Sequence, residues 1–223
     1  MNLLRKGHGD KVWKAFKGRT FSTSVFLGLS RDLAKPFTAP PARIPIEVRP
    51  IRPDDDMSFL EVGKASGSTE GASARVRQLR KLKAGLPVCY LALADGKPCY
   101  MQWLIAARDN DRIRAQFGDL FPRLADNEAL LEGAFTVESF RDMGIMASAM
   151  AQIAERAKEF GATRAITFID GKNISSLRAC KGAGFDPYLE RRELWRLYQR
   201  RVRFSPLPAG TLYPFEAPEL AYS

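Results

Sequence analysis

The chain has 223 residues, of which 45% are hydrophobic and 27% charged, and its formal net charge is +10. This size and composition are typical of one globular domain with enough apolar side chains for a core of its own. The three cysteines are widely spaced and His8 is the single histidine. These counts argue against a disulfide framework, a Cys/His zinc site and a Ser-His or Cys-His catalytic pair. They favour a reducing, cytoplasmic location, and no apolar stretch approaches the ~20 residues required to span a bilayer.

Residues 1–45 differ in composition from the rest of the chain. They contain nine Lys/Arg against Asp10 and Asp32, which gives this segment a net charge of +7. Residues 36–41 form a proline-broken linker in which a helix cannot continue. We interpret residues 1–45 as a basic N-terminal extension that docks on the domain or on an anionic partner. The alternative interpretation is that its charges serve solubility alone. We expect the domain that starts at Ile46 to fold without it.

The first part of the expected domain shows one strand and two helices. Residues 46–52 alternate between apolar and polar side chains, which indicates a half-buried strand. Pro53 and the three acids after it predict the start of a helix that runs toward Gly63. Residues 68–84 predict a second helix, whose later half is rich in arginine and lysine.

Strands are predicted in the middle of the chain. Residues 88–94 and 98–105 are β-rich runs joined by Asp95-Gly96, a strong hairpin signal. Residues 108–126 form a polar connection, and residues 129–137 form a further apolar strand. The pattern therefore predicts a hairpin that is followed, after the connection, by a third strand.

The period then changes to that of a helix. Apolar residues recur at four-residue spacing from Ile145 to Ala157, and Gly161 ends the helix. A short strand at residues 165–169 precedes a helix capped by Asn173, and a last strand pair ends the domain near Phe204. The order predicts a single α/β domain at residues 46–204, with a mixed central sheet flanked by helices. Residues 205–223 are interpreted as a Pro-rich C-terminal tail.

One turn of this pattern suggests an anion site. Arg141 and the flexible Gly144 lie between the strand at residues 129–137 and the long helix. The first-turn N–H groups of a helix have no internal acceptor, and they lie at the positive end of the helix dipole. Gly144 lets the backbone approach a ligand closely, and a pyrophosphate is the natural occupant. The alternative interpretation of a single glycine before a helix is a simple strand-to-helix turn.

The segment from Arg141 to Gly144 resembles the start of the Arg/Gln-x-x-Gly-x-Gly/Ala phosphate loop of the GNAT superfamily of N-acetyltransferases. Gly161, the strand Ala-Ile-Thr-Phe-Ile, the Asn173-Ile-Ser-Ser segment and Gly184-Phe185 come next, in that family's order. The resemblance is weaker back to Ile46, and it covers neither residues 1–45 nor the tail. It implies a GNAT-like fold and acetyl-CoA or another acyl-CoA as the acyl donor, with no metal.

The resemblance also implies roles for individual residues. Phe135, Thr136 and Val137 fall on the strand that holds the acyl carbonyl and the pantetheine arm. Asn173 and Ser176 would line the pantetheine side. The residues that would wrap the pyrophosphate are Arg141, Asp142, Met143, Gly144, Ile145 and Met146. Met146 departs from the pattern, which prefers Gly or Ala there, and this leaves the identity of the acyl donor open.

Two kinds of residue are candidates for catalysis. Cys180 occupies the position where many family members have a tyrosine that protonates the departing thiolate, and a thiol has a pKa suited to that step. The alternative interpretation of Cys180 is a small core residue on a helix. Because no histidine is available, a carboxylate is the expected base. Glu132 is the first candidate and Glu128 the second, and a solvent-facing strand carboxylate is the alternative interpretation of Glu132.

The function expected first is acyl-CoA-dependent N-acyl transfer, most simply N-acetyl transfer, to a small-molecule or amino-acid-like amine. A second hypothesis is an enzyme of the same fold that uses aminoacyl-tRNA or acts on a nucleic-acid-bound partner, because the helix at 68–84 and residues 191–203 are basic. A third is a binding protein without catalysis. The sequence leaves the acceptor and a homodimer open, and Trp103, Phe117, Phe121 and Tyr188 fit an acceptor pocket or the core equally well.

Overall fold

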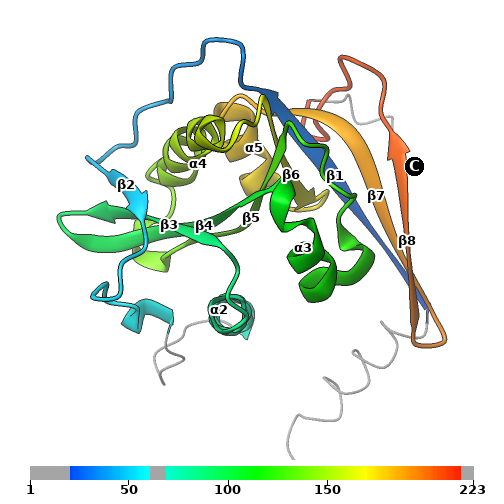
Figure 1. Cartoon of the computed structure of the whole chain (residues 1–223), viewed down its shortest axis with the longest axis horizontal. Coiled ribbons are helices and arrows are strands. Elements are labelled where there is room, and N and C mark those ends of the chain that lie inside the picture. Colours follow the sequence, from blue (N-terminus) through cyan, green and yellow to red (C-terminus); the bar gives the residue numbers. More distant parts are fainter. Residues whose placement is uncertain (1–20, 61–68, 217–223) are drawn as a thin grey trace, which may run out of the picture.

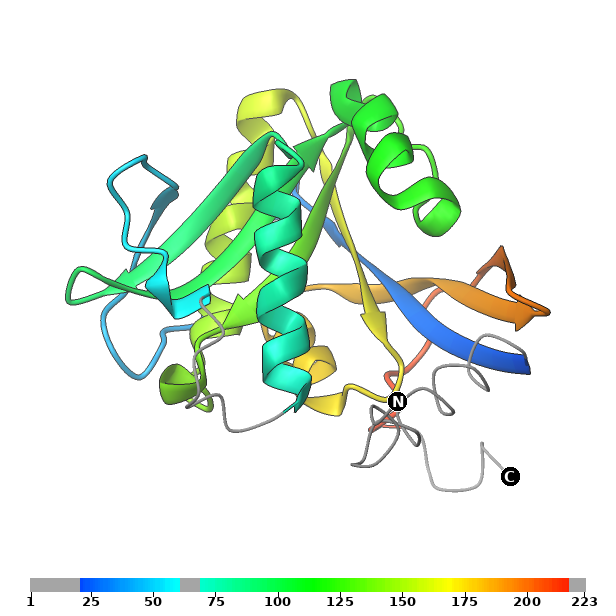
Figure 2. The same cartoon turned by 90° about the horizontal axis from the view of Figure 1, so that it is seen from below.

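The computed structural model describes residues 21–60 and 69–216 as a mixed eight-stranded sheet with helices on both of its faces (Figures 1 and 2). The strands are β1 (Phe21–Asp32), β2 (Glu47–Pro50), β3 (Val88–Ala94), β4 (Lys97–Ala106), β5 (Glu128–Thr136), β6 (Arg164–Asp170), β7 (Asp186–Arg196) and β8 (Gln199–Pro206). The α-helices are α2 (Thr69–Lys83), α3 (Asn110–Phe117), α4 (Ile145–Arg156) and α5 (Ile174–Gly182).

The sheet has the strand order β2-β3-β4-β5-β6-β1-β7-β8. Helices α4 and α5 cover one face, and α2 and α3 cover the other (Figures 1 and 2). The core is accordingly divided into two clusters. One packs α4 and α5 on the sheet around Met150 and Leu177, and the other packs α2 and α3 around Trp103 and Leu130. The predicted α/β domain with a mixed sheet is confirmed.

The predicted hairpin is present at the turn between β3 and β4. Asp95 and Gly96 have positive φ angles of 47° and 74°, as the tight turn requires. All described neighbours in the sheet are antiparallel except β5 and β6, which are parallel and are connected through α4. Antiparallel strands need short turns, whereas a parallel pair needs a crossover, and the helical period from Ile145 onward supplies that crossover.

The structure corrects the expected boundary at residue 45. Strand β1 lies inside the supposed extension, and it pairs with β6 over residues 26–32 and with β7 over residues 21–30. Leu29 and Leu33 are fully buried. Residues 21–32 therefore belong to the sheet, and the domain cannot be complete from Ile46. The partners of β1 lie more than 130 residues away along the chain, so the local pattern gives no sign of them. Residues 1–20, including His8, Trp13 and Phe16, lie outside the described residues.

The proline-rich linker after β1 packs on the domain. The Arg43 N–H donates to the Met143 carbonyl at 2.9 Å. The Phe37 ring lies against Gly184, where a Cβ would come within 2.5 Å of a ring carbon. The Arg31 guanidinium lies 4.2 Å from the centre of the same ring and pairs with Glu155 of α4. Gly184 is thus required by the closeness of this linker.

Three further expectations need correction. Part of the polar connection at residues 108–126 is helix α3, in which Ile113 is buried. The helix expected from Pro53 is replaced by turns and a short 3-10 helix at Ser58–Leu60, and its end lies outside the described residues. The described part of the tail packs on the domain, since the buried Tyr213 donates its hydroxyl to the Phe185 carbonyl at 2.5 Å. None of the described helices is both long and apolar enough to cross a membrane.

The position of β1 predicts the effect of two substitutions in that strand. Leu29→Ala removes a fully buried side chain and should lower the free energy of unfolding by about 2–5 kcal/mol. Val25→Ala, in the same strand but 36% exposed, should cost no more than about 1 kcal/mol. Urea unfolding followed by circular dichroism measures both. Equal stabilities for Leu29→Ala and the unchanged protein would show that β1 is not a core strand.

Candidate functional site

A cleft opens where β5 and β6 separate. The two strands pair through only three positions, residues 128–130 with residues 164–166, and β5 then continues to Thr136 without β6. The cleft has a volume of about 630 Å³. It is lined by Ala74, Arg77, Ala134, Phe135, Thr136, Phe140, Arg141, Asp142, Gly144, Ile145, Met146, Ala147, Asn173, Ser175, Ser176, Arg178 and Ala179. Four elements therefore build it: α2, the end of β5, the start of α4 and the start of α5.

The start of α4 presents free backbone donors to the cleft. Asp142 and Gly144 have positive φ angles of 61° and 72°, and the chain turns sharply between β5 and the helix. No side chain caps α4, and its first turn contains no acidic residue. The N–H groups of Ile145, Met146 and Ala147 precede the first helical hydrogen bond, from the Ser148 N–H to the Gly144 carbonyl. This arrangement can accept an anion, because the unpaired N–H groups lie at the positive end of the helix dipole.

Arginine side chains add positive charge around the same opening. Arg77, Arg141 and Arg178 line the cleft, and Asp142 is the one carboxylate among the described lining residues. Glu138 lies beside the cleft, where its carboxylate pairs with Arg75 at 2.6 Å and with Arg141 at 3.8 Å. Three guanidinium groups together with a helix N-terminus suit a ligand that carries several phosphate charges.

The structure brings together most of the residues expected to bind the acyl donor. Nine of those eleven residues line the cleft, and Val137 and Met143 do not. Met143 packs on the core instead, and its carbonyl accepts the bond from the linker. Asn173 has a structural task as well, because its Oδ1 accepts from the Ser176 N–H at 3.1 Å and caps α5.

Sequence reasoning missed Arg77 and Arg178. Arg178 lies five residues after Asn173, the capping residue of α5. This closeness in the chain to an expected binding residue could have identified Arg178 as a residue of the cleft. Arg77 belongs to the basic part of α2, which the sequence suggested as a nucleic-acid surface. In the structure Arg75 pairs with Glu138 and Lys81 with Glu132, so two of the five basic side chains of α2 are neutralised inside the domain.

Glu132 lies on β5 opposite Trp103 and faces α2. Its Oε1 is 2.6 Å from the Lys81 Nζ, and both side chains are largely buried. The next residue, Gly133, has a φ of +68°, and its carbonyl accepts from the Gln78 Nε2 at 3.1 Å. Glu132 does not line the cleft. It sits on the α2 side of the strand that borders the cleft, already held by a cation.

Glu128, the second candidate base, lies at the far end of β5. Its carboxylate pairs with Arg164 at 3.0 Å and accepts from the Ala125 N–H at 3.1 Å. Eight residues of extended chain, about 26 Å, separate it from Thr136 at the cleft. These contacts and this distance show that Glu128 stabilises the start of β5 and is far from the cleft.

Cys180 does not meet the requirements of a general acid in this cleft. It is fully buried on α5, and its Sγ lies 3.7 Å from the Met150 Sδ inside the core. Burial raises the pKa of the Cys180 thiol far above its ordinary value. The expected role is therefore corrected, and the alternative of a small core residue holds.

The aromatic residues considered for an acceptor pocket are mostly core residues. Trp103 and Phe121 are buried, and Phe121 packs edge-on against Phe168 with 5.6 Å between ring centres. Tyr188 is partly buried beneath the Arg164 guanidinium, 4.2 Å from it. These contacts explain the aromatic residues by packing.

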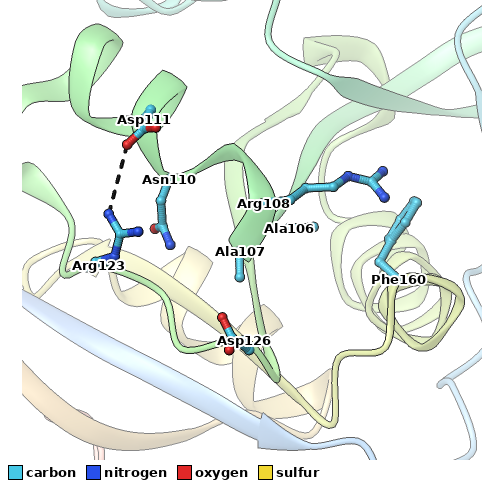
Figure 3. Close-up of a pocket in the computed structure, with 8 residues that line it drawn as sticks. All are labelled: Ala106, Ala107, Arg108, Asn110, Asp111, Arg123, Asp126 and Phe160. Atoms are coloured by element: carbon cyan, nitrogen blue, oxygen red, sulfur yellow. Dashed lines mark ion pairs between the residues drawn. The ribbon is translucent and has the colours of Figure 1, made fainter.

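A second, smaller cavity of about 350 Å³ lies between the end of β4, α3 and Phe160 (Figure 3). Three of its four charged residues, Arg108, Asp111 and Arg123, already face one another or a ring, and the fourth, Asp126, is exposed. Arg123 lies 3.9 Å from Asp111, and Arg108 lies 4.9 Å from the centre of the Phe160 ring. The Asn110 side chain bonds to the backbone of Leu124. None of the residues expected from the sequence to form a site lies here, and we assign no ligand to this cavity.

Comparison with known proteins identifies the fold. No family model and no curated protein matches the sequence. Among solved structures, the GCN5-related glucosamine N-acetyltransferase region of a fungal multi-domain GH3 β-N-acetylglucosaminidase is 14% identical, with a TM-score of 0.57 over 84% of this chain and 23% of that one. A putative GNAT-family acetyltransferase from Novosphingobium aromaticivorans is also 14% identical, with a TM-score of 0.48 over 78% of this chain and 64% of that one. This chain thus spans less than two thirds of either. The fold is the GNAT fold.

The buried positions of the three cysteines predict that their thiols react slowly with reagents in the folded protein. All three are free and buried, and burial raises the pKa of Cys89 to about 12 and of Cys99 to about 11. Because the thiolate is the reactive form, none should be deprotonated at pH 8 in the folded protein. Titration with a disulfide reagent should find no fast-reacting thiol in the native protein and three in denaturant. A fast thiol that Cys180→Ala abolishes would place Cys180 at the cleft after all.

Proposed function

We propose that this GNAT-fold protein is an acyl-CoA-dependent N-acyltransferase, with acetyl-CoA as the simplest donor. The observation that carries the proposal is the cleft at the separation of β5 and β6, where a helix N-terminus and three arginines meet. A fold by itself does not fix an activity, so the proposal depends on the chemistry of this cleft.

The phosphate end of the donor would lie at the start of α4. The N–H groups of residues 145–147 would donate to pyrophosphate oxygens, and Arg141 would bind them from the side. The side chains of Arg77 and Arg178 offer further contacts for phosphate oxygens. Gly144 has a φ of +72°, which glycine adopts without strain, and this conformation forms the turn that presents the N–H groups of α4 to the cleft.

The acyl end would lie along β5. Beyond Leu130 this strand no longer pairs with β6, so peptide groups around Phe135 and Thr136 are available to a ligand. A backbone N–H aimed at the acyl oxygen would stabilise the negative charge that develops when an amine attacks the carbonyl carbon. The new C–N bond forms, the C–S bond breaks, the amine loses a proton and the departing sulfur gains one.

We keep Glu132 as the proposed base, acting across β5 from the α2 side. Its pairing with Lys81 at 2.6 Å means that Lys81 must shift before the carboxylate can accept a proton from the amine or from an ordered water. The same ion pair gives Glu132 a structural role, so rate and stability have to be measured together. The three free thiols suit work in the cytoplasm, where such groups stay reduced.

The donor site predicts the effect of a charge at Gly144. Gly144→Glu should abolish acetyl-CoA binding in calorimetry, because the new side chain strains a turn with a φ of +72° and its carboxylate would repel phosphate at the start of α4. Gly85→Glu is the matched control, since Gly85 has a similar φ of +65°, lies in open space and does not line the cleft. The control should bind normally, and saturation at 100 times the dissociation constant should raise its free energy of unfolding by about 2.7 kcal/mol.

Two results would contradict this assignment. If no CoA species binds the unchanged protein at millimolar concentration, the donor is not a CoA thioester, and an aminoacyl-tRNA donor becomes the better hypothesis. If acetyl-CoA binds tightly but no primary amine from a broad set causes release of free CoA, the protein is a binding protein without catalysis.

The proposed base predicts a rate effect that its neighbour on β5 should not share. Glu132→Gln should lower the rate of CoA release with an accepted amine by about 100-fold or more. Glu128→Gln also removes a carboxylate from an ion pair on β5, at 3.0 Å from Arg164, but lies far from the cleft and should leave the rate unchanged. Thermal unfolding of both variants separates lost stability from lost catalysis. An unchanged pH–rate profile in Glu132→Gln would remove Glu132 from the mechanism.

A further inference from the structure

Strands β1, β7 and β8 continue beyond the rest of the sheet as a three-stranded arm. Residues 21–25 of β1 pair with β7 but no longer with β6, whose pairing begins at Phe26. The arm, defined as residues 21–25, 191–196 and 199–204, projects away from the body of the molecule past α3 (Figures 1 and 2). It shares no residue with the cleft lining.

The pairing register assigns each arm residue to one of two faces. Side chains alternate along a strand, and paired residues share a face. The inner face carries Arg191 and Arg200, which donate to the carbonyls of Leu120 and Phe117 beside α3. The outer face has no such partner element among the described residues. It carries Phe21, Thr23 and Val25 from β1, Arg192, Leu194 and Arg196 from β7, and Arg201 and Arg203 from β8.

The outer face concentrates positive charge. Arg192 lies directly opposite Arg203, an arrangement in which like charges destabilise a sheet. The Glu190 carboxylate pairs with Arg192 at 2.6 Å. For Arg196, Arg201 and Arg203, no carboxylate among residues 21–60 and 74–216 lies within ion-pair distance. Residues 1–20, which precede the arm directly, add six Lys/Arg against one Asp. A polyanion would relieve this repulsion.

The turn at the end of the arm holds two bulky residues in a backbone conformation they disfavour. Leu197 and Tyr198 have φ angles of 47° and 66°, where Asn-Gly would fit without strain. They are 68% and 52% exposed, and Phe21 beside them is 64% exposed. The tip of the arm is therefore a strained and exposed turn, and conformations of this kind are concentrated at sites that bind ligands.

We propose that the outer face of the arm binds a single-stranded nucleic acid, with arginines on phosphates and the aromatic rings of the tip on bases. Arg201 and Arg203 lie about 6.6 Å apart along β8, and adjacent strands lie about 4.8 Å apart, so several guanidinium groups reach one backbone at once. The charged residues of β7 and β8 include six arginines and no lysine. Arginine binds phosphate oxygens in pairs and stacks on bases, and exposed aromatic rings stack on bases as well.

The test measures fluorescence anisotropy of labelled 20-nucleotide single-stranded RNA with the full chain. Arg201→Gln/Arg203→Gln should weaken binding about tenfold or more at 0.1 M salt, and should reduce the slope of log affinity against log salt by about 1.4. Lys97→Gln/Arg156→Gln removes the same net charge at the β3–β4 turn and the end of α4, and should change affinity less than about twofold. Tyr198→Ala should weaken binding about fivefold or more through lost stacking.

Several results would overturn this proposal. One is no RNA binding by the unchanged protein in 50 mM salt, and another is an equal loss in the two double variants, which would make the effect one of net charge. A third is arm-dependent binding to vesicles rich in phosphatidylserine but not to RNA, which would assign the face to a membrane. The affinity for single-stranded DNA of the same sequence, compared with that for RNA, shows whether the ribose 2′-hydroxyl contributes to binding. Unchanged melting temperature and acetyl-CoA binding in the arm variants keep this test separate from the proposed function.

Discussion

Strand β1 lies between β6 and β7 and forms antiparallel hydrogen-bond ladders with both, so a segment near the start of the chain joins the two halves of the sheet. Without it, β7 and β8 would have no neighbour on the side of β6. The linker after β1 depends on the same pairing, because it begins where β1 ends and then packs on the turn before α4 and on Gly184. The arm depends on it as well, since β1 is one of its three strands.

The cleft arises from a different constraint, the early end of pairing between β5 and β6. When a helix connects two parallel strands, it starts at the carboxyl end of the first strand and runs back to the beginning of the second. Ligands commonly bind at these carboxyl ends. Here the start of α4 carries no capping side chain, while α2 and α5 place Arg77 and Arg178 opposite it. The backbone geometry at the start of α4 and three arginines, more than any reactive side chain, make this cleft suited to an anionic ligand.

The arginines and lysines of the chain differ in whether a carboxylate of the domain pairs with them. Two of the five basic residues of α2 form ion pairs inside the domain, Arg75 with Glu138 and Lys81 with Glu132. Those on the outer face of the arm, such as Arg201 and Arg203, have no such partner among the described residues. Net charge alone could not separate these groups, because a charge is informative about a partner only when the fold leaves it unpaired and exposed.

Local patterns in the sequence were enough to predict the α/β class, the β3–β4 hairpin, helices α4 and α5 and most of the loop at the cleft, because each depends on periodicity, turn chemistry or caps. It also placed Asn173 and Gly144 correctly at helix starts. Four features are visible only in the tertiary structure. They are the place of β1 in the sheet, the burial of Cys180, the ion pair of Glu132 with Lys81 and the position of Arg77 at the cleft. Each of these depends on residues distant in the chain, and local pattern carries no information about which distant segment will pack against a given side chain.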